Sequence, residues 1–119
     1  MTNSKHLLLA FATIMTFTGC ATPKDSRLYH WGSYEQQIYA MYNDPGKVPP
    51  EQQLLQLEAD FEKARAANKP VPPGYNAQIG YLCFQLGKID QALNAFETEK
   101  TLFPESTIYI DRLIARIKP

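Results

Sequence analysis

Residues 79–104, IGYLCFQLGKIDQALNAFETEKTLFP, decide the fold that this sequence predicts. Apolar residues recur at helical intervals on both sides of Gly87, which predicts two helices joined by a glycine-capped turn. Gly80 would let the second helix approach closely, and Phe96 would fill the space between the helices. Pro104 would end the second helix, because proline has no backbone N–H to donate.

The spacing of these residues resembles the tetratricopeptide repeat, a helical hairpin with a period of about 34 residues. Ala92 stands four residues before Phe96, as the small residue at the helix crossing does in that repeat, and Pro70 lies one period before Pro104. The sequence departs from the repeat at three positions, where Trp, Tyr and Ala are usual: Asn76, Cys83 and Glu99. A plain antiparallel helical hairpin is the alternative interpretation.

Three further helices are predicted outside this pair, which makes the chain all-α with about five helices. The five would cover about 34–43, Pro50 to near Asn68, Tyr75 to Leu86, Asp90 to Pro104, and the residues after Ser106. Ser33 with Gln36 has the spacing of a capping box, while Asp90 and Ser106 are expected to cap the last two helices. In the first helix, Tyr34, Ile38 and Tyr42 would share one face.

The N-terminus has the pattern of an exported lipoprotein precursor. Lys5 precedes an apolar run, Leu7 to Thr18, which is shorter than the roughly 20 residues that span a membrane. The run ends in Gly19-Cys20, which resembles the lipobox of bacterial lipoproteins although Phe17 stands where Leu is usual. The resemblance implies that residues 1–19 are a signal peptide, that Cys20 is acylated, and that Ala21 directs the protein to the outer membrane.

The mature chain would consist of a polar tether, residues 20–28, and a helical domain, residues 29–119. Three segments of the sequence resemble the family of bacterial lipoproteins known as the domain of unknown function numbered 4810. The segments are Gly19–Thr22, Tyr29–Tyr34, and the run from Glu62 through Pro70-Val-Pro-Pro-Gly74 to Ser106. Members of that family look like lipoproteins that are encoded beside a curli-secretion-channel-like lipoprotein and a second small lipoprotein. The resemblance therefore implies a role in a cell-envelope assembly.

Composition argues against several other classes of function. The full chain carries 12 Lys and Arg against 12 Asp and Glu, which is not the basic surface that nucleic-acid binding needs. His30 is the one histidine after the signal peptide, so we expect no metal and no cofactor. Cys83 would be a buried thiol, and Glu58, Asp60 and Glu62 would be solvated charges on a helix face. The sequence thus offers no catalytic constellation and no evident small-molecule site.

Two sets of aromatic residues are candidates for binding a partner protein. Trp31 and Tyr34 belong to the aromatic segment Tyr29–Tyr34, which is a candidate for contact with a partner or a membrane surface; the alternative is packing against the second helix as part of the core. Tyr81 and Phe84 occupy positions that line the concave groove in tetratricopeptide proteins. They lie away from the apolar stripe of their own helix, so they are expected to be exposed unless an earlier helix covers them.

These observations predict an outer-membrane lipoprotein that faces the periplasm and binds a protein partner, with neighbouring lipoproteins as candidates. One alternative is a pilotin-like chaperone that escorts an outer-membrane channel subunit. A second alternative, from another class, is an envelope enzyme that uses Cys83.

Overall fold

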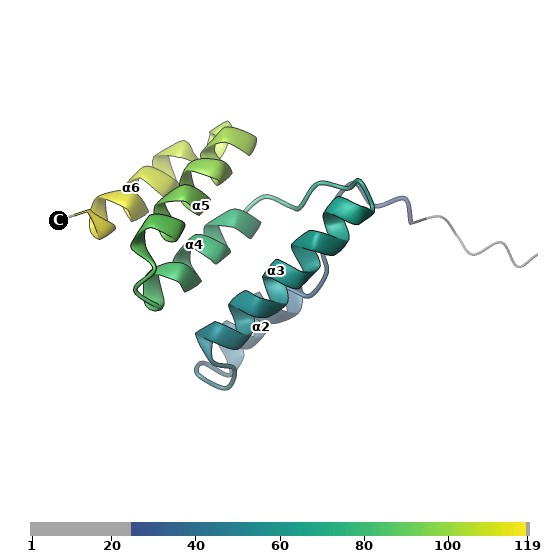
Figure 1. Ribbon diagram of the computed structural model, residues 1–119, viewed down its shortest axis with the longest axis horizontal. Helices are drawn as coiled ribbons and strands as arrows, with labels where there is room; N and C mark the ends of the chain where they lie inside the picture. Colours follow the sequence, from purple (N-terminus) through teal and green to yellow (C-terminus); the bar gives the residue numbers. More distant parts are fainter. Residues whose placement is uncertain (1–24, 119) are drawn as a thin grey trace, which may run out of the picture.

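The computed structural model describes residues 25–118. The signal peptide and the acylation site predicted at Cys20 lie outside these residues. The described chain is helical, as predicted, and contains no β-strand. Its elements are α2 (Tyr34–Asn43), α3 (Pro50–Ala66), α4 (Tyr75–Gln85), α5 (Ile89–Leu102), a 3-10 turn (Pro104–Ser106) and α6 (Thr107–Ile117) (Figure 1).

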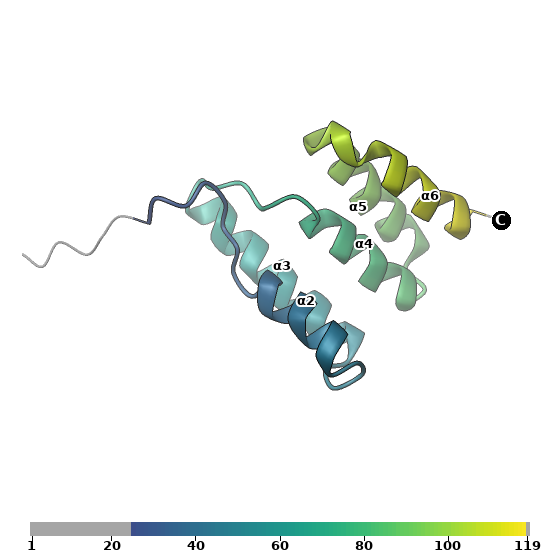
Figure 2. The same ribbon diagram turned by 180° about the vertical axis from the view of Figure 1, so that it is seen from behind.

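The helices form two antiparallel hairpins and a final single helix. α2 and α3 run antiparallel and are joined by a short loop, α4 and α5 form the most closely packed pair, and α6 packs against α5 at the far side from α3 (Figures 1 and 2). One hydrophobic core runs through both hairpins and reaches α6, and its most buried side chains come from four helices: Leu57, Tyr75, Leu82, Phe96 and Ile110. The apolar stripes of α3, α4 and α6 therefore meet in a single core.

Gly80 lies directly beneath the ring of Phe96, which confirms the packing predicted from their spacing. A Cβ atom added at Gly80 would stand 2.7 Å from Cε1 of Phe96, closer than two carbon atoms can approach. Ala92, also predicted at this crossing, has no exposed surface. The small residues thus allow α4 and α5 to pack closely.

Two helices end in the hydrogen-bonded arrangement that a left-handed residue permits. Gly87, with φ of 72°, donates its N–H to Phe84, and Lys88 donates to Cys83, which is the Schellman motif. The glycine cap predicted from the sequence is therefore confirmed. After α3, Asn68 adopts φ of 50°. It donates its N–H to the Arg65 carbonyl, and Lys69 donates to the Ala64 carbonyl, which is the same motif.

Ser33 and Ser106 hold the N-cap positions predicted for them, but no side-chain hydrogen bond caps α2, α5 or α6. The Ser33 hydroxyl donates to Asp60 on α3, and no capping box forms with Gln36. α5 begins two residues earlier than expected, so Asp90 lies in its first turn and Lys88 holds the cap position. Ser106 does precede α6, but its hydroxyl donates to the carbonyl of Phe103.

The face predicted for the first helix is also only partly correct. Tyr34 and Ile38 are half-buried, whereas Tyr42 at the end of α2 is exposed.

Over residues 25–118, no helix has the length and apolar character required to cross a membrane.

Candidate partner-binding surfaces

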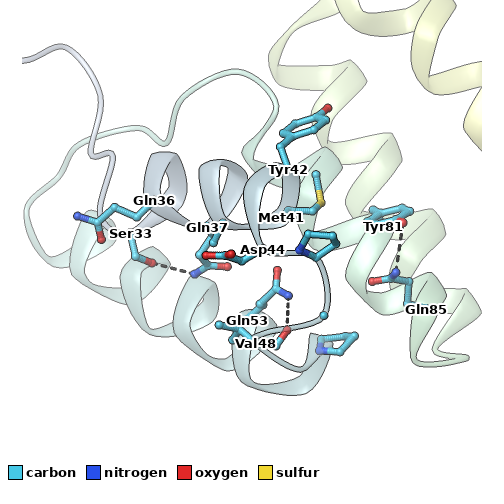
Figure 3. A pocket seen from close by; sticks show the side chains of 14 residues that line it. Ser33, Gln36, Gln37, Met41, Tyr42, Asp44, Val48, Gln53, Tyr81 and Gln85 are labelled. Atoms are coloured by element: carbon cyan, nitrogen blue, oxygen red, sulfur yellow. Dashed lines mark hydrogen bonds between the residues drawn. The ribbon is translucent and has the colours of Figure 1, made fainter.

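A groove of about 590 Å³ opens between the first hairpin and the C-terminal half of α4. Ala40 and Met41 of α2 form one wall, Val48 of the α2–α3 loop lies at its base, and Tyr81 and Gln85 of α4 form the other wall (Figure 3). The first helices of the two hairpins therefore line it from opposite sides. A groove of this size and largely apolar lining is typical of a ligand or peptide site.

Four glutamines are among the polar residues that line the groove. Gln37 donates to the Ser33 hydroxyl at 2.9 Å, and Gln53 donates to the Val48 carbonyl at 2.7 Å. The side-chain oxygens of both glutamines are buried and accept no hydrogen bond from within residues 25–118. Asp44 is the one charged residue among those that line the groove. Gln36 and Gln85, which also line the groove, are exposed and can offer their amides to a partner.

The structure exposes both residues predicted on α4. Tyr81 lines the groove, and its hydroxyl accepts a hydrogen bond from Gln85 at 3.2 Å. Phe84 is exposed to a similar degree but does not line the groove. Burial of the pair by an earlier helix, the alternative considered for them, is therefore excluded.

Trp31 and Tyr34 belong to a continuous series of aromatic contacts within the domain. Tyr29 packs edge-on against Phe103 and against Trp31, with 6.4 Å between ring centroids in each case. Trp31 stacks on Tyr34 at 6.3 Å, and Tyr34 meets the buried ring of Tyr75 at 5.4 Å. Trp31 and Tyr34 are therefore half-buried in intramolecular packing, and contact of either with a partner stays a prediction.

The expectation that all the carboxylates of α3 are solvated is wrong for Asp60. It is 3% exposed, and its Oδ2 accepts the N–H and the hydroxyl of Ser33 at 2.8 and 2.6 Å. Burial alone would raise the pKa of Asp60, but hydrogen bonds from Ser33 and Lys63 outweigh it and lower the pKa to about 2. Asp60 thus joins α3 to the start of α2.

Glu99 is a second buried carboxyl group, and sequence reasoning noted it only as a departure from the repeat. It is 1% exposed and accepts the N–H of Gly74 at 2.6 Å and that of Asn76 at 3.1 Å. The periodicity did contain a signal for both acids. Asp60 lies three residues after buried Leu57, and Glu99 lies three residues after buried Phe96, so each falls on the apolar stripe of its helix.

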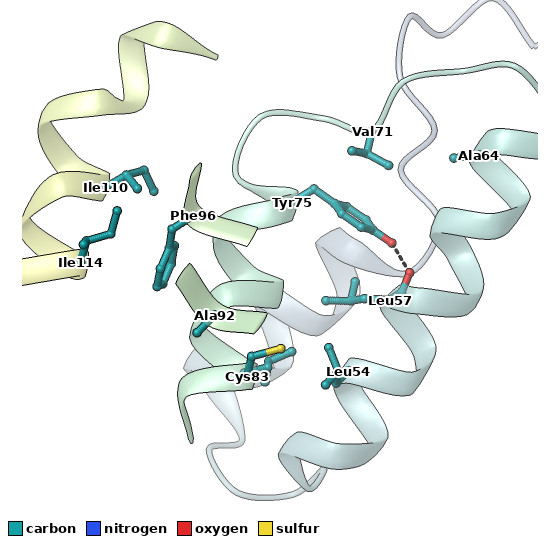
Figure 4. Packing of buried hydrophobic residues seen from close by; sticks show 11 residues of the cluster. Leu54, Leu57, Ala64, Val71, Tyr75, Cys83, Ala92, Phe96, Ile110 and Ile114 are labelled. Carbon is teal, nitrogen blue, oxygen red and sulfur yellow. Dashed lines mark hydrogen bonds between the residues drawn. The ribbon is translucent and has the colours of Figure 1, made fainter. Parts of the chain in front are cut away.

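Cys83 lies in the core, as predicted, beside the aromatic and aliphatic side chains drawn in Figure 4. Burial raises the pKa of its thiol, and this outweighs the opposite effect of Lys88. In the same core, Tyr75 donates its hydroxyl hydrogen to the Leu57 carbonyl at 2.6 Å. Between Asp25 and Lys118, no three metal-binding side chains come together.

The fold and these surfaces define an all-α protein of stacked helical hairpins with an open, largely uncharged groove. Residues 28–113 match the family described as "Domain of unknown function (DUF4810)". The match covers more than half of the sequence, and the chain belongs to this family. No curated protein and no solved structure matches the chain.

Proposed function

We propose that this protein is an outer-membrane lipoprotein that binds a protein partner in a cell-envelope assembly. Cys20 would carry the lipid, and the domain would face the periplasm. The curli-secretion-channel-like lipoprotein implied by the family resemblance is the first candidate partner. The hairpins would act as a tetratricopeptide-like unit that presents a groove to this partner.

The observation that carries this proposal is the groove between α2 and α4. Its walls combine apolar side chains with the Tyr81 ring and the exposed amides of Gln36 and Gln85. A peptide segment offers both apolar side chains and backbone N–H groups, so it complements this lining. The Gly19-Cys20 site supports attachment of the domain to a membrane.

Site-specific photocrosslinking in intact cells tests the proposal. A photoreactive residue at Tyr81 is expected to join the protein to a lipoprotein or channel of the outer membrane, identified by mass spectrometry. The same residue at Arg112, exposed on α6, is the matched control and should give no such product. Labelled palmitate should enter the wild-type protein and fail to enter Cys20→Ser. Absence of an envelope partner at Tyr81, or of the palmitate label, would contradict the proposal.

A pilotin-like chaperone is the second candidate, and it differs in its dependence on the lipid. Escort of a channel subunit to the membrane requires the anchor, so a functional, soluble Cys20→Ser protein would exclude it. The enzyme alternative finds less support, because Cys83 is buried and its pKa is raised.

A further inference from the structure

The chain enters the domain at a fixed point beside the end of α3. Asp25 makes an ion pair with Lys69 at 2.9 Å, and Lys69 also donates to the Asp25 carbonyl at 3.0 Å. A little further on, His30 donates its N–H to the Pro70 carbonyl at 2.8 Å. In Figure 2 the segment that leads to α2 runs beside the α3–α4 loop. The first described residues are thus held to one end of the hairpins.

The distance between this end and a membrane follows from the number of residues that separate Asp25 from the lipid. If Cys20 is acylated, as proposed above, residues 20–24 span at most roughly 17 Å even when fully extended. The end of the domain that holds Asp25 would then stay close to the bilayer surface. The groove extends along α2 toward the opposite end, where its lining includes the α2–α3 loop and Gln85 at the end of α4.

The end near the tether carries exposed apolar side chains. Leu28 is 71% exposed and Leu102, at the end of α5, is 54% exposed. A shallow hollow of about 340 Å³ lies here, lined among others by Tyr29, Lys69 and Leu102. We call this the tether-end surface, and it consists of Leu28, Tyr29, Arg65, Lys69, Leu102 and Phe103.

The composition of the tether-end surface suits the boundary between lipid headgroups and acyl chains. Aromatic rings and exposed leucines are stabilised there, and long cationic side chains reach outward to phosphate. The cations are already paired, since Lys69 contacts Asp25 and Arg65 contacts Glu62 at 3.2 Å. Apolar contact is therefore the main attraction, and the fraction of anionic lipid should matter little.

We propose that the tether-end surface rests on the phospholipid leaflet that holds the lipid of Cys20, with Leu102 at the headgroup boundary. This proposal depends on the acylation proposed above. It gives the domain a fixed orientation, in which the groove opens away from the membrane toward the periplasm. The lipid would then orient the binding site as well as localise it.

Fluorescence quenching in vesicles tests this orientation. The full lipidated protein carrying Leu102→Cys is labelled with an environment-sensitive fluorophore and placed in phosphatidylethanolamine–phosphatidylglycerol vesicles. Lipid brominated on its acyl chains should quench this label at least twofold more than a label on Leu55→Cys, the matched control. Leu55 is 68% exposed, but it lies near the N-terminal end of α3. The buried thiol of Cys83 should stay unlabelled.

Two different failures can be told apart. Mass spectrometry of the mature N-terminus shows whether Cys20 carries lipid, and an unmodified cysteine would overturn both the anchor and the orientation. A lipidated protein whose labels at positions 102 and 55 are quenched equally would overturn the orientation alone. Circular dichroism of each labelled variant verifies that the helices are retained.

Discussion

The carboxyl group of Glu99 on α5 accepts the backbone N–H of Gly74, which directly precedes α4, at 2.6 Å. It also accepts the N–H of Asn76, so one side chain satisfies two of the donors that every helix leaves free at its start. Asp60 on α3 satisfies one such donor for α2, the N–H of Ser33 at the N-cap position. In each hairpin, the second helix therefore caps the first.

Loss of this carboxyl group should destabilise the domain strongly. Glu99→Ala leaves the N–H groups of Gly74 and Asn76 buried without an acceptor and opens a cavity, so we expect a loss of about 2–4 kcal/mol. Urea unfolding followed by circular dichroism measures it. Glu97→Ala on the exposed side of the same helix is the control and should change stability by less than about 0.5 kcal/mol. Equal losses in the two variants would contradict the capping role.

Asp60 should make stability depend on acid pH. Its folded pKa of about 2 lies below its ordinary value of 3.8, so the charged form stabilises the fold above pH 3.8. This contribution is about 2 kcal/mol, and it declines as the pH falls through 3.8 toward 2. Asp60→Asn should therefore lower the free energy of unfolding most at pH 7 and progressively less toward pH 2.

Asp44→Asn serves as the control for this titration, because Asp44 is exposed and lies in the α2–α3 loop. Urea unfolding at several pH values between 2 and 7 compares both variants with the wild type. A loss for Asp60→Asn that stays constant across this range would show that its hydrogen bonds do not depend on the charge.

The close packing of α4 on α5 makes a third prediction. In Gly80→Ala the new methyl group collides with the Phe96 ring, and we expect a loss of about 1–3 kcal/mol. The double variant Gly80→Ala with Phe96→Leu removes the ring that the methyl group meets. Its loss should be smaller than the sum of the two single losses, as a thermal or urea double-mutant cycle measures. Additive losses would mean that the two residues do not contact.

The five helices could be predicted because apolar residues recur at helical intervals within them, and because Gly and Pro residues mark where helices begin or end. Gly87 caps α4 as expected for this reason. The three caps failed for different reasons: α5 begins before Asp90, Ser106 bonds the nearby carbonyl of Phe103, and a tertiary partner competes for the hydroxyl of Ser33. Ser33 shows this competition, since Asp60 is 27 residues away in sequence and binds its hydroxyl.

The groove was predictable only in part. The repeat pattern placed Tyr81 on the lining, but the other wall comes from Met41 and Val48, which the pattern did not connect with it. The relation between the two hairpins depends on the Pro-rich loop before α4. A turn signal in the sequence predicts that the chain leaves its helix there, but it does not give the angle at which the next hairpin packs.

Cys83 should be unreactive in the folded protein. Its thiol is buried and its pKa is raised, so both access and the fraction of reactive thiolate are low at neutral pH. In a Cys20→Ser chain, where Cys83 is the remaining cysteine, a disulfide reagent should react slowly until urea unfolds the domain. The control is the same chain with Leu55→Cys, whose exposed thiol should react promptly in the folded state. Rapid modification of Cys83 without denaturant would contradict this prediction and favour the thiol-enzyme alternative. Such a reaction would require a path from solvent to the core and a group that lowers the pKa of the Cys83 thiol.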